Sequence, residues 1–485
     1  MKTPLFFALA AVCILASCNS RTINPDSIFV FNLSSQKQLI RNNGFIRVYE
    51  TATNRLVDSI DLSVPDGPET SIREGDIKYA TVPYQYARSF VATNANTPPG
   101  TPSGQGMPTS TKYQLDIIGG FTDGFHFHPI IYTDSTAKVY LHHNVLDYGK
   151  KYRMKIDKNI VASHSITFKF STKHNKPLMK DTLVVSCEGK GDFNTIQGAL
   201  DFIPDNLMQP VVVFVKNGDY EELVYFRNKR NVTLLGESRD GVVIHYPNNE
   251  VFNPHPMNIR TNELLGTFPS RRVAFAADNC SYMVFRNLTI KNDLPGQAEG
   301  LLLMGDHNRL YNVKIIGDGD ALQVNGSTYF KDCVIDGGGD TVLGRGPSFF
   351  NHCSLYNRGG AFTWIRNTQV NHGDVFLNCK FANSMGRESS LGRAPMNKGR
   401  YYPYNESVFI HCELSNIVPE GWESVDGETS NMHFWEYDSH SSSGTFIDVS
   451  SRNKASRQFK MPDDDILIRN YSNPDFILDW NVPEK

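Results

Sequence analysis

The sequence predicts an all-β protein in which a β-sandwich precedes a right-handed parallel β-helix. Three observations support this prediction. The chain has 485 residues, too many for one ordinary compact domain. Its 37 glycines and 25 prolines are typical of a turn-rich β protein rather than a helical one. The strongest observation is an eight-residue pattern that recurs six times between residues 285 and 416.

Residues 1–18 are predicted to be an export signal. Lys2 supplies a positive start, and the apolar stretch 5–16 is too short to span a bilayer as a mature helix. The stretch runs into Ala16-Ser17-Cys18, which resembles the bacterial lipobox, where the cysteine becomes the lipidated first residue. Cys18 is therefore the predicted lipidation site of a lipoprotein at the outer membrane or cell surface, facing the periplasm or the exterior. The alternative is an ordinary cleaved signal with a chance cysteine.

The next part of the chain is predicted to be rich in β-strands. Residues 29–33 and 44–49 alternate apolar and polar side chains, as half-buried strands do. Strand-like stretches continue to residue 171 at a spacing typical of a sandwich, and residues 141–172 loosely resemble Ig-like modules that precede bacterial carbohydrate enzymes. The predicted division is residues 1–18 signal, 19–27 tether, 28–173 Ig-like β-sandwich, 174–180 linker and 181–485 β-helix.

The β-helix is predicted from the repeat itself. Each copy has the form apolar, any, Asn/Asp/His, apolar or Cys, any, apolar, any, Asn or Gly. The copies begin at residues 285, 310, 330, 350, 376 and 409, in steps of 25, 20, 20, 26 and 33 residues. A coil of about 20 residues with occasional longer loops is typical of a parallel β-helix. Each coil buries its apolar positions only by stacking on its neighbours.

The repeat also predicts structural roles for the polar residues and cysteines that recur at fixed repeat positions. Four cysteines share one repeat position, so stacked free thiols are favoured over the disulfides that export would otherwise suggest. Polar side chains at the preceding position are expected to satisfy turn backbone at successive corners. The cysteines are Cys333, Cys353, Cys379 and Cys412, and the corner residues include Asn287, Asn312, Asp332 and Asn378.

The net charge and the spacing of the cysteines argue against nucleic-acid binding and metal binding as functions. The 48 Lys and Arg residues nearly balance 51 Asp and Glu residues, for a net charge of -3, so no global basic field attracts nucleic acid. No Cys-x-x-Cys pair occurs, and neither a metal site nor a cofactor is expected. The expected membrane contact is through the lipid anchor alone, and the chain is expected to act as a monomer.

Two acidic motifs stand one coil apart. Asp320 lies in the segment 317–322 and Asp340 in the segment 339–344, a separation of 20 residues. The two carboxylates are therefore expected on neighbouring strands about 5 Å apart. Two carboxylates at that distance do not both ionise cheaply, so one pKa rises and the other falls. This would make an acid/base and a nucleophile from one residue type. The alternative is a pair of solvated turn carboxylates, and spacing alone does not decide between them.

Five short motifs stand in order between residue 181 and about 438. They are 218–222, similar to Gly-x-Tyr-x-Glu; 297–301, similar to Gln-Ala-Val-Ala-Leu; 317–322, similar to Gly-Tyr-Gln-Asp-Thr-Leu; 340–344, similar to Asp-Phe-Ile-Phe-Gly; and 391–393, similar to Leu-Gly-Arg. Ordered motifs at consistent spacing are far more specific than any one of them, and through these the chain resembles the pectin methylesterases. The resemblance implies a pectin-lyase-like parallel β-helix and an esterase that removes methyl esters from galacturonate in pectin or a related methylated uronate polymer.

The resemblance implies a role for each matched residue. Asp340 would attack the ester carbonyl as nucleophile. Gln297 would donate its amide to the oxyanion. Asp320 would protonate the departing methanol and then activate water. Arg393 would hold Asp340 ionised through a two-pronged salt bridge. Sugar-binding roles are predicted for Trp422, Trp364, Arg366 and Tyr401, with core packing as the alternative for Trp422 and ordinary surface positions as the alternative for Trp364 and Arg366.

The chain also departs from the family pattern. The family glutamine before the acid Asp is Gly319 here, so one oxyanion donor is lost, and a second family glutamine falls in the segment 362–365, which has no amide side chain. The substrate is therefore expected to differ from ordinary pectin. The alternative function is a non-catalytic glycan-binding lipoprotein on the same scaffold. Hydrolysis or lyase cleavage of galacturonan is disfavoured, because the Asp-Asp cluster with a Gly-His-Gly loop and the calcium-type carboxylate cluster are both missing.

Overall fold

The computed structural model describes residues 21–33, 43–67, 113–121, 124–133, 135–253, 270–393, 402–425 and 427–483. By its internal contacts the chain divides into two units. One comprises residues 1–68 and 109–199, and the other residues 69–108 and 200–485. Among the described residues, no helix has the length and apolar character needed to cross a bilayer.

The first unit contains two β-sheets that share one hydrophobic core. The alternating stretch 44–49 overlaps β3 (Phe45–Glu50), in which every second side chain is buried. Phe29 and Val139 from one sheet lie in the same buried cluster as Val48 and Met154 from the other. The layered arrangement expected of a sandwich is therefore present, and the likeness to Ig-like modules stays a prediction.

In the described part of this unit up to residue 172, the strands fall into sheets of five, three and two. The five-stranded sheet has the order β1 (Arg21–Ile23), β10 (Ile166–Thr172), β9 (Lys151–Ile156), β3 (Phe45–Glu50) and β4 (Leu56–Asp61); the three-stranded sheet has the order β2 (Phe29–Asn32), β8 (Thr136–Val139) and β7 (Ile130–Tyr132); and β5 (Leu115–Asp116) pairs with β6 (Phe125–His126).

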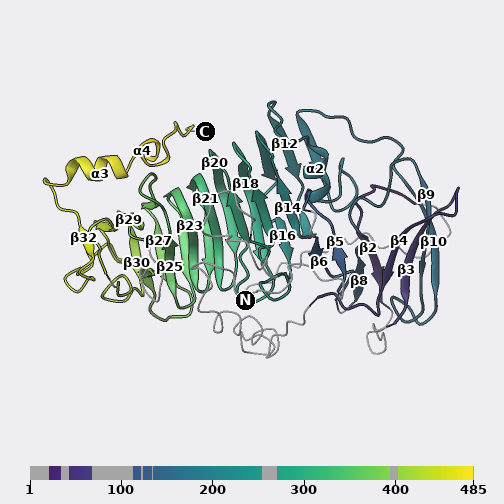
Figure 1. The fold of residues 1–485 in the computed structure, drawn as a ribbon, viewed down its shortest axis with the longest axis horizontal. Helices are drawn as coiled ribbons and strands as arrows, with labels where there is room; N and C mark the ends of the chain where they lie inside the picture. The colour runs from purple at the N-terminus through teal and green to yellow at the C-terminus, as the bar shows by residue number, and fades with distance from the viewer. Residues whose placement is uncertain are drawn as a thin grey trace, which may run out of the picture. The chain divides into compact units, whose positions relative to one another are not determined.

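The remaining strands form a parallel β-helix. Strands pair in parallel with those of the next coil, and in the second unit they run side by side along the ribbon (Figure 1). The six repeats lie in register as the sequence predicts, because Leu310 pairs with Phe330, Phe330 with Phe350, and Phe376 with Phe409. The same column continues upstream through Leu234, which pairs with Phe285, so the stack begins before the first repeat found in the sequence.

In the described residues this sheet has 22 strands, and a short helix, α2 (Ile196–Phe202), lies between its first two. The strands are β11 (Thr182–Val185), β12 (Val211–Val215), β13 (Gly218–Glu221), β14 (Val224–Arg227), β15 (Val232–Gly236), β16 (Val242–Tyr246), β17 (Phe275–Asp278), β18 (Val284–Asn292), β19 (Leu301–Met304), β20 (Asn308–Ile316), β21 (Asp320–Lys331), β22 (Val334–Gly337), β23 (Asp340–Asn351), β24 (Ser354–Asn357), β25 (Ala361–Ile365), β26 (Asp374–Leu377), β27 (Lys380–Asn383), β28 (Ser390–Gly392), β29 (Glu406–Ile410), β30 (Glu413–Ser415), β31 (His433–Tyr437) and β32 (Ser456–Gln458).

The interior of the stack is built from columns of identical or similar side chains. Phe330, Phe350, Phe376 and Phe409 stack face to face, with ring centroids 4.4, 4.6 and 5.0 Å apart. The four repeat cysteines are buried and free, which confirms the prediction of unpaired thiols. Burial raises the pKa of these thiols, so they behave as small apolar side chains.

The corner position of the repeat is set by the backbone. Residues there adopt the left-handed conformation, which Asn and Asp tolerate better than most side chains. Asn312 also donates an amide hydrogen bond of 3.0 Å to Asn287 on the previous coil. The predicted corner position of these residues is confirmed, and the left-handed backbone explains their residue types, while the predicted bonding of their side chains to turn backbone stays a prediction. Their φ angles are 56° for Asn287, 51° for Asn312, 56° for Asp332, 54° for His352, 54° for Asn378 and 52° for His411.

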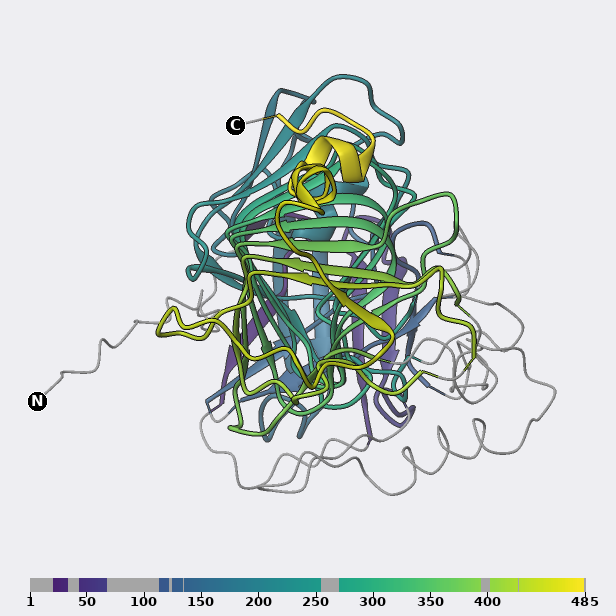
Figure 2. The ribbon, with the colours of Figure 1, turned by 90° about the vertical axis from the view of Figure 1, so that its left-hand side faces the viewer.

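The C-terminal segment covers the outside of the stack with two short helices, α3 (Asp465–Tyr471) and α4 (Pro474–Leu478). Figure 2 looks along the coils and shows these helices against one side of them. Ile468 and Leu478 pack in a buried cluster with Phe349 and Val408, which point outward from β23 and β29. The helices therefore bury an apolar sheet face that would otherwise meet water.

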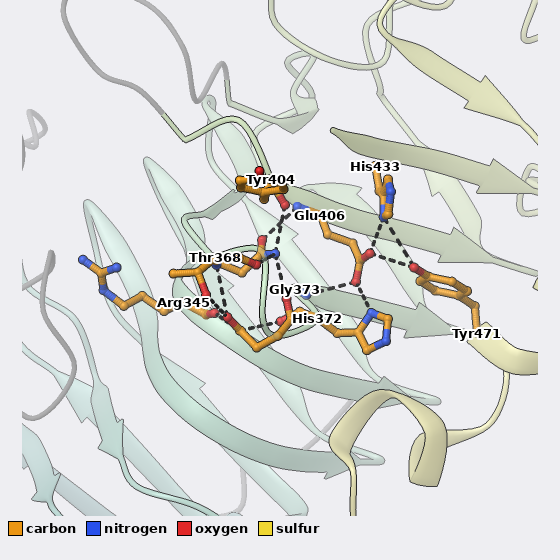
Figure 3. Close-up of polar contacts among 10 residues, drawn as sticks. Arg345, Thr368, His372, Gly373, Tyr404, Glu406, His433 and Tyr471 are labelled. Carbon is orange, nitrogen blue, oxygen red and sulfur yellow. Dashed lines mark hydrogen bonds and ion pairs between the residues drawn. The ribbon is translucent and has the colours of Figure 1, made fainter. Parts of the chain in front are cut away.

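A buried carboxylate lies at the centre of this cover (Figure 3). Glu406 accepts hydrogen bonds from His372 Nδ1 at 2.8 Å, the Gly373 N–H at 3.0 Å and the Tyr471 hydroxyl at 2.7 Å, and it also contacts His433. Burial opposes ionisation of Glu406, but the hydrogen bonds from His372 and His433 outweigh it and lower its pKa to about 2. Because Tyr471 belongs to α3, this carboxylate ties the C-terminal segment to the coils.

Candidate active site

Asp320 and Asp340 occupy equivalent places on consecutive coils. They begin β21 and β23 and are register partners in the parallel ladder. The Asp340 N–H donates to Asp320 Oδ1 at 3.1 Å, so the first carboxylate is oriented by the backbone of the second residue. The side chains are 13% and 8% exposed. The one-coil spacing in the sequence therefore places the two carboxylates side by side, as expected.

The surroundings of Asp320 and Asp340 affect the pKa values of the two carboxyl groups differently. Burial is the largest effect on Asp320 and raises its pKa to about 7, with Arg272 opposing the rise and Glu299 and Asp340 adding to it. Burial also raises the pKa of Asp340, and the Arg393 guanidinium opposes that rise. The expectation that one of the two pKa values falls is therefore wrong, because both carboxyl groups are buried. Arg393 Nη1 lies 2.6 Å from Asp340 Oδ2. We expect Asp340 to be the ionised member of the pair and Asp320 to hold the proton.

Arg393 reaches Asp340 from the end of β28, where its backbone N–H bonds to the Thr363 carbonyl at 2.8 Å. It makes one hydrogen bond to Asp340 instead of the two-pronged salt bridge expected from the sequence. The Arg393 guanidinium also lies 4.3 Å from the ring centroid of Trp364. Arg366 lies 4.5 Å from the same ring, and its charge also favours the ionised form of Asp340. Trp364 and Arg366 thus lie close to Asp340, but Arg366 is only 1% exposed, so the surface position considered for it is wrong.

Gln297 lies beside the position of the missing amide. Its side chain is exposed, and it follows Gly296, whose N–H donates to Asp318 Oδ2 at 2.6 Å and whose carbonyl accepts from the Gly319 N–H. A Cβ added at Gly319 would lie 2.2 Å from the Gly296 carbonyl oxygen and 3.2 Å from the Gln297 nitrogen. The space that a side chain at Gly319 would need is therefore occupied by the backbone that presents Gln297.

Three charged residues near Asp320 were not predicted from the sequence. Arg272, which precedes β17, lies 3.0 Å from Asp320 Oδ2 and makes a two-pronged contact with Glu299. Its other terminal nitrogen is 3.7 Å from Glu250. One signal was present: Glu299 stands in the 297–301 motif where the resembling family has valine. A charged side chain in an apolar motif position requires a buried partner.

Other predicted site residues lie elsewhere or outside the described residues. The Trp422 side chain is 1% exposed, and its ring stacks on Phe434 with centroids 5.3 Å apart and planes 13° from parallel. It also packs against Gly392, which leaves no ring face for a sugar, so the sugar-binding role predicted for Trp422 is replaced by core packing. Tyr401 and Cys18 lie outside the described residues.

Comparisons with known proteins agree with this fold and these motifs. The family model described as Pectinesterase matches residues 182–479. Putative pectinesterase 11 of Arabidopsis thaliana is 29% identical over 315 residues, which cover 62% of this chain and 80% of that protein. Pectinesterase 31 of Arabidopsis thaliana is 27% identical over 265 residues, covering 52% of this chain and 80% of that protein.

Solved structures support the same fold. Pectin methylesterase from carrot superposes with a TM-score of 0.52 at 20% sequence identity, covering 63% of this chain and 95% of that one. Pectin methylesterase PemA from Erwinia chrysanthemi superposes with a TM-score of 0.50 at 23% identity, covering 63% of this chain and 99% of that one. At these identities the structures establish the parallel β-helix fold alone. The match of the family model over most of the chain shows that this protein belongs to the pectinesterase family of carbohydrate esterases.

Proposed function

We propose that this protein removes methyl esters from galacturonate residues of pectin or a related methylated uronate polymer, with Asp340 as nucleophile and Asp320 as acid/base. One observation supports this most strongly. Asp320 and Asp340 are register partners on adjacent strands, and Arg393 lies 2.6 Å from Asp340, whereas Arg272 is shared between Asp320 and Glu299. That asymmetry gives one carboxylate for attack and one carboxylic acid for proton transfer.

In the first half-reaction, an Asp340 carboxylate oxygen attacks the ester carbonyl carbon. The carbonyl electron pair moves to oxygen, and the Gln297 amide donates a hydrogen bond to that oxyanion. When the tetrahedral intermediate collapses, the carbon–methoxy bond breaks and Asp320 transfers its proton to the methoxy oxygen. Methanol leaves, Asp320 becomes a carboxylate, and Asp340 is held as an acyl-enzyme anhydride.

In the second half-reaction, the ionised Asp320 takes a proton from water as that water attacks the acyl carbon. The bond to Asp340 breaks, which restores the Asp340 carboxylate and releases the uronic acid, and this acid then gives its proton to water. Asp320 has regained its proton, so the cycle closes without a cofactor or metal ion. Arg393 stabilises the Asp340 carboxylate at the beginning and at the end of the cycle.

Two features support a substrate that differs from ordinary pectin. Gly319 lacks the amide of the resembling motif, and the loop backbone at Gly296 leaves no room for one. Trp364 is half-buried beside Arg393, where an aromatic ring suits a sugar, while Arg366 is 1% exposed and acts on Asp340 through its charge. We propose that the polymer is uronate-rich and that it is recognised partly through Trp364.

The test is methanol release from methylated pectins by the wild type, Asp340→Ala and Asp320→Asn. We expect Asp340→Ala to lose at least about a thousandfold in kcat. Asp320→Asn should lose roughly a hundredfold to ten-thousandfold. Equal release by all three proteins would reject the assigned roles. The matched control is Asp336→Asn, which removes a half-buried carboxylate bonded to Arg358 at 2.6 Å on β22, outside the pair.

A second candidate is a non-catalytic glycan-binding lipoprotein on the same scaffold. The observation that favours it is the loss of the Gly319 amide, since one oxyanion donor contributes roughly a hundredfold to a thousandfold in rate. Binding of a methylated uronate oligomer with no methanol release under any condition would support this candidate. Release that depends on Asp340 would reject it.

We also propose that the protein is exported and anchored by a lipid on Cys18, at the outer membrane or cell surface. Residues 28–173 would then form an Ig-like spacer or glycan-contact module. We propose that the chain acts as a monomer. The support is the lipobox-like string at residues 15–18 and the two-sheet core of the first unit. Labelling with radioactive palmitate should mark the wild type and fail with Cys18→Ala. Equal labelling of both would reject the anchor.

A further inference from the structure

Arg272 and Glu299 form a buried ion pair that touches the proposed acid/base residue. Arg272 Nε lies 2.8 and 2.7 Å from the two Glu299 carboxylate oxygens, and Nη2 lies 2.5 Å from Oε1. The same Nη2 donates to Asp320 Oδ2 at 3.0 Å. The Arg272 side chain is 8% exposed, and that of Glu299 is fully buried. The proposed mechanism does not use either residue.

Arg272 makes more and shorter contacts with Glu299 than with Asp320. Glu299 takes the Nε and the short Nη2 contacts, while Asp320 receives a longer, shared hydrogen bond from Nη2. Asp340, in contrast, has the Arg393 guanidinium at 2.6 Å, and the charge of Arg366 also favours its ionised form, while Glu423 disfavours it. Electrostatic interaction at these distances is strong in a buried site. Asp340 is therefore favoured as the anion, and Asp320 is left with the weaker cation.

We propose that Arg272 and Glu299 are positioning residues with different parts: Arg272 orients Asp320, and Glu299 weakens the pull of Arg272 so that Asp320 stays in the acid form needed to protonate the leaving methanol. Arg272 fixes Oδ2 while the Asp340 N–H fixes Oδ1 at 3.1 Å, so both carboxyl oxygens are placed. Glu299 competes for the cation and adds its own negative field. This inference rests on the acid/base role given to Asp320 in the proposed function.

Burial and several neighbouring charged groups together determine the pKa of Asp320. Burial is the largest cause that raises the pKa of Asp320, to about 7, and Arg272 is the largest cause that lowers it. Glu299 and Asp340 raise it further. The charged groups facing Asp320 are Arg272 before β17, Glu299 before β19, Asp340 on β23 and Arg393 after β28, with Glu250 3.7 Å from Arg272.

The test uses two variants with opposite expected effects. Glu299→Gln removes the competing anion and frees Arg272 for Asp320, so the pKa of Asp320 should fall and the alkaline limb of the kcat/KM profile should move about one pH unit lower. The double variant Arg272→Gln/Glu299→Gln removes the cation as well. Because Arg272 is the larger of the two influences, that limb should then move above the wild-type position.

The matched control is Glu436→Gln. Glu436 and Arg452 form another buried pair, with nitrogen–oxygen contacts of 2.9 and 3.0 Å and side-chain exposures of 1% and 3%. Glu436 lies on β31, and its column of register partners leads through β29 and β26 to Phe350 on β23. Three strand spacings, roughly 14 Å, therefore separate Glu436 from Phe350. This variant should lose stability as Glu299→Gln does, without moving the pH limb. Equal limbs in the wild type, Glu299→Gln and the double variant would overturn the inference.

A second measurement separates this inference from the proposed function. The infrared carbonyl band of a neutral carboxylic acid is recorded below the pKa of Asp320 in the wild type, Asp320→Asn and Glu299→Gln. The band assigned to Asp320 should vanish in Asp320→Asn, and in Glu299→Gln it should vanish at a lower pH than in the wild type. Absence of methanol release would reject the proposed function and leave this measurement intact, whereas an unchanged band in Glu299→Gln would reject the inference.

Discussion

At the scale of single residues, identical side chains differ because their neighbours differ. Asp320 and Asp340 have the same chemistry and equivalent backbone positions. Asp340 has the Arg393 guanidinium at 2.6 Å, whereas Asp320 lies a longer 3.0 Å from Arg272, which it shares with Glu299. Desolvation disfavours the charged form of both, and the closer cation decides which one ionises. The division of roles is thus set by two arginines that are far apart in the sequence.

The first prediction concerns pH. Acylation needs ionised Asp340 and protonated Asp320, so kcat/KM should be bell-shaped. The pKa of Asp320 is raised to about 7, so activity should fall as the pH rises through that value and the acid form is lost. The acid limb reports the ionisation of Asp340, and both apparent values belong to the coupled pair. Methanol release measured across the pH range checks this, and an alkaline limb that persists in Asp320→Asn would contradict it.

The second prediction concerns the missing amide. Gly319→Gln restores the residue of the resembling motif, but its Cβ would lie 2.2 Å from the Gly296 carbonyl oxygen. We expect no gain in kcat and a loss of roughly 1–3 kcal/mol in the free energy of unfolding, because backbone has to move. Thermal unfolding and methanol release measure both effects. Lys331→Gln, at the other end of β21, is the control, and a more active Gly319→Gln of normal stability would show that the loop yields easily.

At the scale of elements, each strand is held by its corner and by its neighbours. A left-handed residue ends the strand after the interior phenylalanine on successive coils, and the phenylalanines stack at 4.4 to 5.0 Å. The helices α3 and α4 are too short to be stable alone, so they depend on the sheet face that they cover. Glu406 adds a polar tie between α3 and the coils through Tyr471.

The third prediction tests that tie. The pKa of Glu406 is lowered to about 2 from an ordinary 4.5, so its ionised form contributes stability above pH 4.5 that is lost as the pH falls toward 2. The contribution is of the order of 3 kcal/mol. Glu406→Gln should lose most of it at neutral pH and show a flatter decline in acid. Hydrogen exchange should accelerate first in α3.

The control for this prediction is Glu413→Gln on the neighbouring strand β30. Its ion pair with Lys380, at 3.0 Å, is partly exposed and is worth little in water. This variant should leave α3 protected. Equal effects of the two substitutions on α3 would contradict the proposed tie.

At the scale of the whole molecule, the coils share one continuous interior. The column positions are filled by the same residue types on successive coils, so no coil can be exposed without opening its neighbours. Buried thiols report on this directly, because the thiolate is the reactive form and burial raises the pKa of Cys280, Cys353 and Cys412.

The fourth prediction follows from that shared interior. A thiol reagent added to the native protein should label Cys187, which is half-buried, and should spare the buried cysteines of the described residues until unfolding. They should then become reactive together within one cooperative transition. Mass spectrometry of the labelled peptides identifies the sites. Early labelling of Cys412 ahead of Cys333 would show that the stack opens from its C-terminal end.

The sequence by itself determined the features that repeat or that lie at fixed spacing. The 20-residue separation placed Asp320 beside Asp340, and the repeat placed the cysteines inside and residues such as Asn287 at the corners. These features follow from local periodicity, because a coil of nearly constant length converts sequence distance into height along the stack. The family motifs added Arg393 and Gln297 to the same neighbourhood.

Only the tertiary structure decided which distant side chains meet. Arg272 contacts Asp320 across 48 positions, and no period in the sequence relates them. Trp422 turned out to pack on Phe434 inside the stack, since the path of a loop between coils decides whether a ring faces water. The lack of space for a side chain at Gly319 also depends on tertiary structure, because Gly296 approaches it closely only in the folded loop. Periodic positions are fixed by local geometry, whereas the charge balance around the catalytic pair is fixed by loops of variable length.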